Sequence, residues 1–172
     1  MRIVVVEDEA PIREGMAKIL SKINTDYKVV GTAVDGEKGL ELIRKEQPDL
    51  VIMDIRMPHM TGLEMLSRLR HEQNKCKVIV LSAYSDFAYA KQAIELGIEN
   101  YLLKPINIVE LKNALQQAEA ELVKAQNQDR AFSLEYIFNS CINGHLQPDD
   151  AFHKMTQEKY GFTVRDSAEI ML

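Results

Sequence analysis

Three carboxylates stand at the ends of short apolar stretches in the first third of the chain. Glu7 and Asp8 follow Ile3–Val6, and Asp54 follows Leu50–Met53. Carboxylates that are brought together repel one another, and a divalent cation is a natural way to offset their charge. Hard oxygen ligands with no cysteine or histidine beside them favour Mg²⁺, which binds one or two carboxylates and keeps some of its water.

A serine and a lysine extend this candidate site. Ser82 follows the apolar stretch Lys77–Leu81, and Lys104 follows Tyr101–Leu103. Lys104 offers a mobile cation to an anion beside Asp54, and Ser82 offers a hydroxyl donor. Taken singly, each has an ordinary alternative as a helix cap or a solvated surface charge. Taken together at strand ends, they predict a phosphoryl-transfer site with Asp54 as the nucleophile.

Such a site needs a sheet whose strand ends meet along one edge. Short apolar stretches alternate with amphipathic helices five times within about 120 residues, which is typical of a parallel sheet with helices on both faces. We predict an α/β fold, a doubly wound (βα)5 five-stranded parallel sheet of strand order 2-1-3-4-5, with a helical C-terminal extension. The expected strands are Ile3–Val6, Tyr27–Ala33, Leu50–Asp54, Lys77–Leu81 and Tyr101–Leu103.

Composition argues against several classes of protein. The chain has 172 residues, 46% of them hydrophobic, which suffices for one packed domain and a further segment. Its net charge of -5 argues against nucleic-acid binding by this part of the protein. No apolar run approaches the roughly 18 residues of a membrane helix, and Cys76 and Cys141 form no C-x-x-C pair. We therefore expect a cytoplasmic protein with reduced thiols and no membrane association.

The motifs together resemble the receiver domain of two-component response regulators. The resemblance covers roughly residues 1–122, and the combination of spacings is highly specific. The matching residues are Glu7-Asp8, Asp54, Pro58, Gly62, Ser82, Tyr101 and Lys104-Pro105.

This resemblance implies a phosphoacceptor and a metal site. Asp54 would accept a phosphoryl group from a phosphohistidine of a sensor histidine kinase. Asp8, Asp54 and the backbone carbonyl of Arg56 would ligate Mg²⁺, with Glu7 assisting through water. Glu7 departs from the commoner aspartate at its position, and its extra methylene puts direct metal ligation there in doubt.

The resemblance also implies a switch. Ser82 would hydrogen-bond the acyl phosphate, Lys104 would pair with it, and Tyr101 would turn inward as the switch aromatic. The Lys104-Pro105 bond is cis in such domains. The stretches Ser82–Phe87 and Tyr101–Pro105 look like the subgroup that carries a C-terminal AraC-type helix-turn-helix.

The sequence after residue 122 predicts helices and the start of a second domain. We expect a receiver domain at residues 1–122, a helical linker at 123–132 and the helical start of a truncated second domain at 133–172, with DNA binding and transcriptional output through the missing remainder. Apolar residues from Ile108 to Ala125 follow a heptad spacing, whose first half must also cover the sheet. Either this helix continues towards an effector and supports a homodimer formed on phosphorylation, or it is a last receiver helix with a frayed extension.

Two other functions fit parts of the pattern. A phosphatase of the haloacid dehalogenase type needs a second aspartate two residues after its nucleophile, where this chain has Arg56. A flavodoxin-like FMN module needs a phosphate-binding loop after the first strand, where this chain has Glu7-Asp8-Glu9. Both positions argue against these alternatives, so we expect a regulatory domain that is not an enzyme and takes Mg²⁺ as its cofactor.

Overall fold

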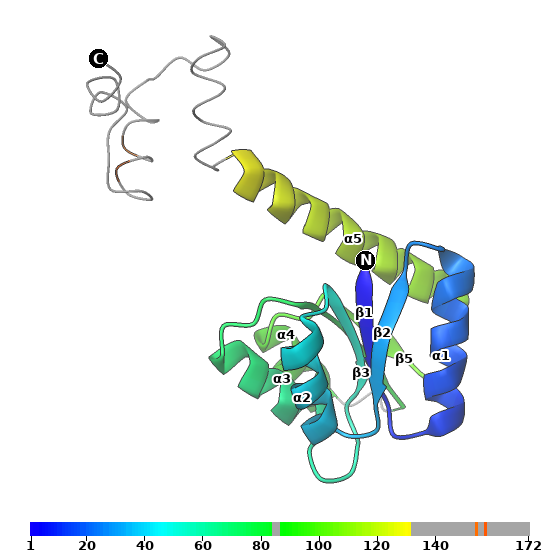
Figure 1. The fold of residues 1–172 in the computed structure, drawn as a ribbon. Coiled ribbons are helices and arrows are strands. Elements are labelled where there is room, and N and C mark those ends of the chain that lie inside the picture. Colours follow the sequence, from blue (N-terminus) through cyan, green and yellow to red (C-terminus); the bar gives the residue numbers. More distant parts are fainter. Residues whose placement is uncertain (84–86, 132–153, 155–156, 158–172) are drawn as a thin grey trace, which may run out of the picture. The chain divides into compact units, whose positions relative to one another are not determined.

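The computed structural model describes residues 1–83, 87–131, 154 and 157, and one five-stranded sheet organises the described part (Figure 1). Neighbouring strands run parallel in the order β2-β1-β3-β4-β5. This confirms the predicted doubly wound sheet. The strands are β1 (Arg2–Val6), β2 (Lys28–Ala33), β3 (Leu50–Asp54), β4 (Lys77–Ser82) and β5 (Asn100–Leu103).

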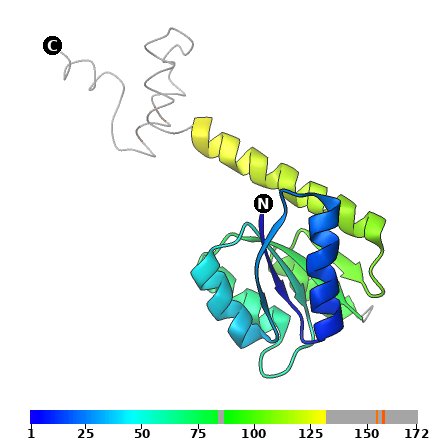
Figure 2. The ribbon, with the colours of Figure 1, turned by 45° about the vertical axis from the view of Figure 1, so that its right-hand side comes forward.

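Helices cover both faces of the sheet (Figures 1 and 2). On one face, α1 (Ala10–Ile23) and α5 (Ile108–Ala131) contribute to a single buried apolar cluster with the strands. On the other face, a second cluster includes residues of α2 (Gly36–Glu46), α3 (Gly62–His71) and α4 (Phe87–Glu95). The sheet is therefore buried on both sides, which explains the continuous apolar stretches of its central strands.

Strand register brings the ends of β1 and β3 together. Val6 of β1 lies opposite Met53 of β3. Glu7 and Asp54 are the next residues along these two parallel strands, so both side chains reach the same edge of the sheet. This edge is where ligands bind in open α/β sheets.

Four of the five strands differ from the prediction by one residue at one end. Three are longer, because β1 begins at Arg2, β4 ends at Ser82 and β5 begins at Asn100, whereas β2 is shorter. The strand expected from Tyr27 begins at Lys28. The backbone N–H of Tyr27 donates to the Asn24 carbonyl at 3.1 Å, so Tyr27 belongs to the turn after α1 and Lys28 is the first residue bonded to β1. The Tyr27 hydroxyl donates instead to Glu119 of α5 at 3.0 Å.

The last helix packs on the sheet along its first half only. Leu111, Leu115 and Ala118 are fully buried in the cluster shared with α1, whereas Val123 is half exposed. These heptad positions are therefore taken by the domain's own core. The chain divides into compact units at Met1–Val123 and Lys124–Leu172, and α5 continues as helix to Ala131.

The helices predicted beyond Ser133 lie outside the described residues, apart from helical positions 154 and 157. Among the described helices, none combines the length and the apolar character needed to cross a bilayer.

Candidate functional site

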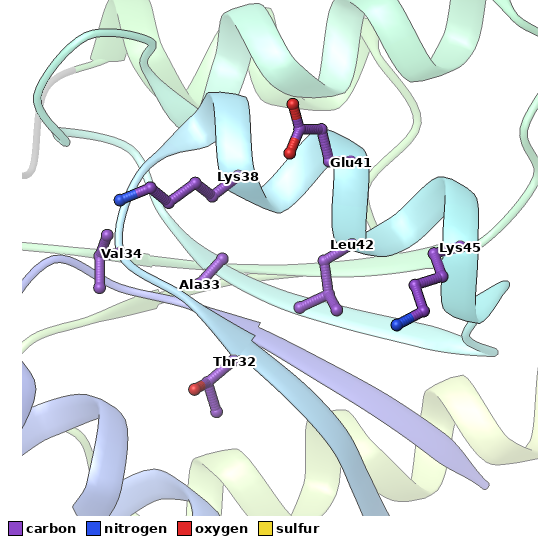
Figure 3. Close-up of a pocket in the computed structure, with 7 residues that line it drawn as sticks. All are labelled: Thr32, Ala33, Val34, Lys38, Glu41, Leu42 and Lys45. Atoms are coloured by element: carbon purple, nitrogen blue, oxygen red, sulfur yellow. The ribbon is translucent and has the colours of Figure 1, made fainter.

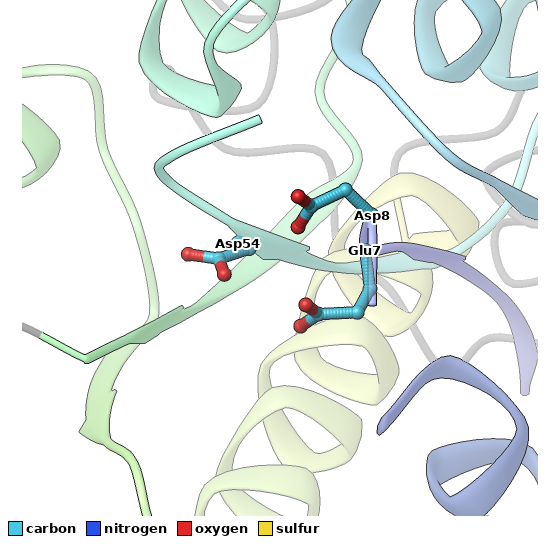
Figure 4. Close-up of side chains that lie close together, drawn as sticks. All are labelled: Glu7, Asp8 and Asp54. Carbon is cyan, nitrogen blue, oxygen red and sulfur yellow. The ribbon is translucent and has the colours of Figure 1, made fainter. Parts of the chain in front are cut away.

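The structure brings the three predicted carboxylates together (Figure 4). Glu7 and Asp8 follow β1 and Asp54 ends β3, and each offers one carboxylate oxygen within 4.8 Å of the others. Their environments differ, because Glu7 and Asp54 are buried whereas Asp8 is exposed. Such a donor set, made only of carboxylates, suits a hard divalent cation.

Asp54 is held from two directions. Its Oδ1 accepts hydrogen bonds from the backbone N–H groups of Ile55, at 2.5 Å, and Arg56, at 3.3 Å. Its Oδ2 accepts a hydrogen bond from Lys104 Nζ at 2.6 Å. Asp54 is buried, and these contacts orient its carboxylate.

Lys104 is shared among three carboxylates, of which Glu9 is the most distant at 3.8 Å. Besides Asp54, its Nζ contacts Glu7 Oε1 at 3.0 Å and Oε2 at 2.8 Å. Burial alone would lower the pKa of Lys104, but the hydrogen bonds to Asp54 and Glu7 outweigh it and raise the pKa above its usual value. Lys104 is therefore cationic. The sequence predicted a mobile side chain at this position, whereas in the structure hydrogen bonds to Glu7 and Asp54 hold it.

Glu7 is the most deeply buried acid of the group. Burial raises the pKa of Glu7, the hydrogen bond from Lys104 lowers it, and the charge of Asp54 raises it further, with a net upward shift. Its Oε2 lies near Lys104 but has no partner with hydrogen-bond geometry. A buried oxygen without a directed partner, beside two more carboxylates, fits a cluster that can accept a cation.

The ends of β4 and β5 supply the remaining predicted residues. Ser82 is buried, and its carbonyl accepts the backbone N–H of Lys104 at 2.8 Å, which places the two residues next to each other. The Lys104-Pro105 bond is cis, as the resemblance implied. Tyr101 is half-buried in β5 and packs against the apolar cluster on the α4 side of the sheet.

Arg56 has a side-chain contact that the sequence did not predict. Its Nη2 donates to the Tyr89 hydroxyl of α4 at 3.3 Å, and its guanidinium carbon lies 5.5 Å from the centre of that ring. The loop after Asp54 is therefore linked to α4 by a cation–π contact as well as a hydrogen bond.

The loop after Asp54 closes through Gly62. The backbone N–H of Gly62 donates to the Ile55 carbonyl at 2.9 Å. A Cβ at Gly62 would lie 2.1 Å from the backbone oxygen of Asp54, so only glycine fits there. Thr61 and Glu64 then form a capping box that starts α3. The close approach of Gly62 to the backbone of Asp54 therefore helps to hold that backbone in place.

A separate groove of about 390 Å³ lies between the end of β2 and α2 (Figure 3). None of the clustered carboxylates lines it, so it is not part of the candidate site. Its lining residues are Thr32, Ala33, Val34, Lys38, Glu41, Leu42 and Lys45.

Comparison with known proteins points to one family. A family model described as the response regulator receiver domain matches residues 3–116. The transcriptional regulatory protein HptR of Staphylococcus aureus is 38% identical over 128 residues, which are 74% of this chain and 50% of HptR. The chain therefore spans about half the length of the curated relatives it matches.

Solved structures agree in fold. The receiver domain of AraT, a response regulator from Geobacillus stearothermophilus, is 34% identical with a TM-score of 0.66, covering 73% of this chain and 97% of that one. A DNA-binding response regulator of the LuxR family from Staphylococcus aureus is 28% identical with a TM-score of 0.64, covering 68% and 97%. These matches do not decide whether an AraC-type domain follows, so that subgroup stays a prediction.

Proposed function

The chain belongs to the response regulator receiver family, and from this premise we propose that Asp54 accepts a phosphoryl group from a phosphohistidine of a sensor histidine kinase. The observation that carries the proposal is the position of Asp54, held by two backbone N–H groups and Lys104 beside Glu7 and Asp8. The haloacid dehalogenase alternative is not favoured, because Arg56 occupies the position of its general acid and bonds Tyr89 instead.

The proposed transfer exchanges one bond for another. An oxygen of Asp54 bonds to phosphorus while the P–N bond of the phosphohistidine breaks, and the electron pair returns to the imidazole nitrogen. The carboxylate becomes an acyl phosphate, so negative charge moves outward onto the phosphoryl oxygens. Lys104 is 11% exposed and already bonded to Asp54, so it can follow that charge with a small displacement.

A divalent cation would complete the site. Asp8, Asp54 and the backbone carbonyl of Arg56 would hold Mg²⁺, with Glu7 contributing through water. When bound, the cation offsets the negative charge of the three carboxylates and of the phosphoryl oxygens. Glu7 is committed to Lys104 from its buried position, which supports an indirect role for its carboxylate.

The phosphoryl group would act as a switch through β4 and β5. The hydroxyl of Ser82 would bond a phosphoryl oxygen, and Tyr101 would move towards the space that this leaves. In this role the domain is a stoichiometric acceptor and not an enzyme. Because its relatives include a protein described as a transcriptional regulator, we propose transcription as the output that this domain controls.

Acetyl phosphate tests the proposal directly. With Mg²⁺, the wild-type chain should gain one phosphoryl group that is labile to acid and base, detected by intact mass. Addition of EDTA should abolish the gain, because Lys104 alone would then face the three carboxylates and the incoming phosphoryl group. Absence of the modified species under both conditions would contradict the assignment of a phosphoacceptor site.

The metal ligands should rank in a defined order. Asp8→Asn should weaken Mg²⁺ binding at least about 100-fold, because a direct carboxylate ligand is lost, and Glu7→Gln about 10-fold, as for a partner outside the inner ligands. Glu14→Gln, on the exposed face of α1, removes the same charge and serves as the control. Titration of amide chemical shifts with Mg²⁺ measures all three. A larger loss for Glu7→Gln than for Asp8→Asn would make Glu7 the principal ligand.

Exposed apolar side chains around β5 support the proposed homodimer. Phe87 and Ile94 of α4 are 81% and 69% exposed, and Leu103, Ile108 and Val109 are also exposed. β5 is an edge strand, and α4 and α5 pack on opposite faces of the sheet beside it. Contact with a second copy would remove these side chains from water, next to Tyr101 and Lys104.

Phosphorylation should therefore strengthen self-association. A beryllofluoride mimic of the phosphoryl group should tighten the dimer at least about 10-fold in sedimentation experiments, which is about 1.4 kcal/mol. Ile94→Glu should reverse this gain, whereas Thr32→Glu, exposed on the opposite edge strand β2, should not. Leu122→Glu tests the part of α5 beyond the buried positions. A protein that stays monomeric with beryllofluoride would contradict the proposed dimer.

A further inference from the structure

Arg13 reaches back from α1 to the loop that carries the acidic pair. Its Nη1 donates to the backbone carbonyl of Glu7 at 2.7 Å and to that of Asp8 at 3.2 Å. The backbone N–H of Arg13 also donates to the Glu9 carbonyl at 3.0 Å in the first turn of the helix. One residue is thus tied to three consecutive carbonyl groups of the loop between β1 and α1.

These two side-chain contacts fix the peptide planes on either side of Asp8. The Glu7 carbonyl belongs to the peptide bond that precedes Asp8, and the Asp8 carbonyl belongs to the bond that follows. Because a peptide unit is planar, holding both carbonyls sets the φ and ψ angles of Asp8 and hence the direction of its Cβ.

Asp8 depends on this support more than its neighbours do. Glu7 is buried and bonded to Lys104, and Asp54 is bonded to Lys104 and to two backbone N–H groups. The Asp8 side chain is exposed, and no hydrogen bond to its carboxylate occurs among the residues that the structure describes. At the start of α1, Glu9 also makes no side-chain capping bond.

We propose that Arg13 is a positioning residue that aims the Asp8 carboxylate at the Mg²⁺ site, an inference that rests on the proposed function. If the loop could rotate about Asp8, metal binding would have to order it, and the lost conformational entropy would lower the affinity for Mg²⁺. Arg13 removes that cost beforehand, through the backbone and without contact with the metal.

Charge and position predict opposite results when Arg13 is removed. As a nearby cation, Arg13 repels Mg²⁺, so its loss should tighten binding through the Coulomb term alone. As a positioning residue, Arg13 favours binding, so its loss should weaken it. The sign of the change therefore separates the two roles.

The test compares the metal-binding properties of matched variants of the full chain. Arg13→Met should weaken Mg²⁺ binding about 10-fold, a typical loss for a group that orients a ligand. Lys18→Met removes the same charge from an exposed position of α1 and should leave the affinity unchanged or slightly higher. Arg13→Lys keeps the charge and a donor group, and its Mg²⁺ affinity should lie between those of the wild type and Arg13→Met. Affinity is read from amide chemical shifts titrated with MgCl₂, well below each variant's unfolding temperature.

The metal-free protein gives a second measurement. Arg13→Met should shift or broaden the amide signals of Asp8 and Glu9 and leave those of β3 unchanged. Unchanged or tighter Mg²⁺ binding by Arg13→Met, with wild-type amide signals for the loop, would overturn the inference. Failure of the wild-type chain to bind Mg²⁺ would instead contradict the proposed metal site, so the two failures can be told apart. If Arg13→Met fails to fold, an affinity of Arg13→Lys equal to or tighter than wild type overturns the inference as well.

Discussion

Asp54→Asn should reduce phosphorylation by acetyl phosphate to less than about 1% of the wild-type level, because the attacking oxygen of a carboxylate is replaced by a neutral amide. The substitution preserves shape. The amide oxygen of asparagine can still accept the N–H groups of Ile55 and Arg56, so the loop keeps its hydrogen bonds. The oxygen that accepts from Lys104 is replaced by an amide nitrogen, which cannot accept a hydrogen bond, so Lys104 keeps its bond to Glu7 and loses the one to position 54.

Asp49→Asn is the matched control for this prediction. Asp49 precedes β3 at the opposite edge of the sheet, where its Oδ2 accepts the backbone N–H of Arg2 at 2.6 Å. It has the same side chain as Asp54 but stands before the first residue of β3, whereas Asp54 is the last residue of that strand, beside Lys104. Asp49→Asn should therefore be phosphorylated like the wild type. Full phosphorylation of Asp54→Asn would show that another residue is the phosphoacceptor and would contradict the proposal for Asp54.

The positions of the site residues could be predicted because strand ends are visible in the sequence. A run of buried apolar residues that stops at a carboxylate locates Asp54 to the residue. Once the strand order is assumed, the convergence of Glu7 with Asp54 follows from the parallel register alone. Strands that are buried on both faces are continuous apolar runs, so the residue at which each run stops marks the end of a strand.

The contacts made by long side chains could not be predicted in the same way. Lys104 was expected to be mobile, yet it bonds Glu7 and Asp54 across separations of 97 and 50 residues. Arg13 and Arg56 make their contacts through guanidinium groups whose direction depends on the packed backbone. Spacing along the chain sets which strand end a residue follows, but not which of several nearby acceptors its side chain selects.

The heptad of α5 shows a pattern with two possible meanings. Apolar residues at steps of three and four predict one apolar face, whatever covers it. In the structure Leu111, Leu115 and Ala118 face the domain's own core, so the pattern up to that point records packing within one chain. Of the heptad positions, the exposed Ile108 and those from Leu122 onward remain for contact with another chain.

Gly62→Ala should lower the free energy of unfolding by about 3 kcal/mol or more, the upper range for overpacking a buried position. An added Cβ would lie 2.1 Å from the Asp54 carbonyl oxygen and 3.4 Å from the Cα of Ile55, and backbone atoms cannot move aside as a flexible side chain can. Helix propensity predicts the opposite sign, because Gly62 is the first residue of α3 and alanine favours helices by about 1 kcal/mol.

Gly15→Ala separates these two effects, because Gly15 lies inside α1 and an added Cβ would meet no atom within 4 Å beyond its chain neighbours and its own helix backbone. It should stabilise the domain by about 0.5–1 kcal/mol, whereas Gly62→Ala should destabilise it. Urea unfolding of both variants gives the two signs in one experiment. The clash also acts on the backbone of Asp54, so folded Gly62→Ala should be phosphorylated more slowly than wild type. A loss below about 1 kcal/mol for Gly62→Ala would mean that the loop after Asp54 can relax, and that Gly62 does not hold the phosphoacceptor in place.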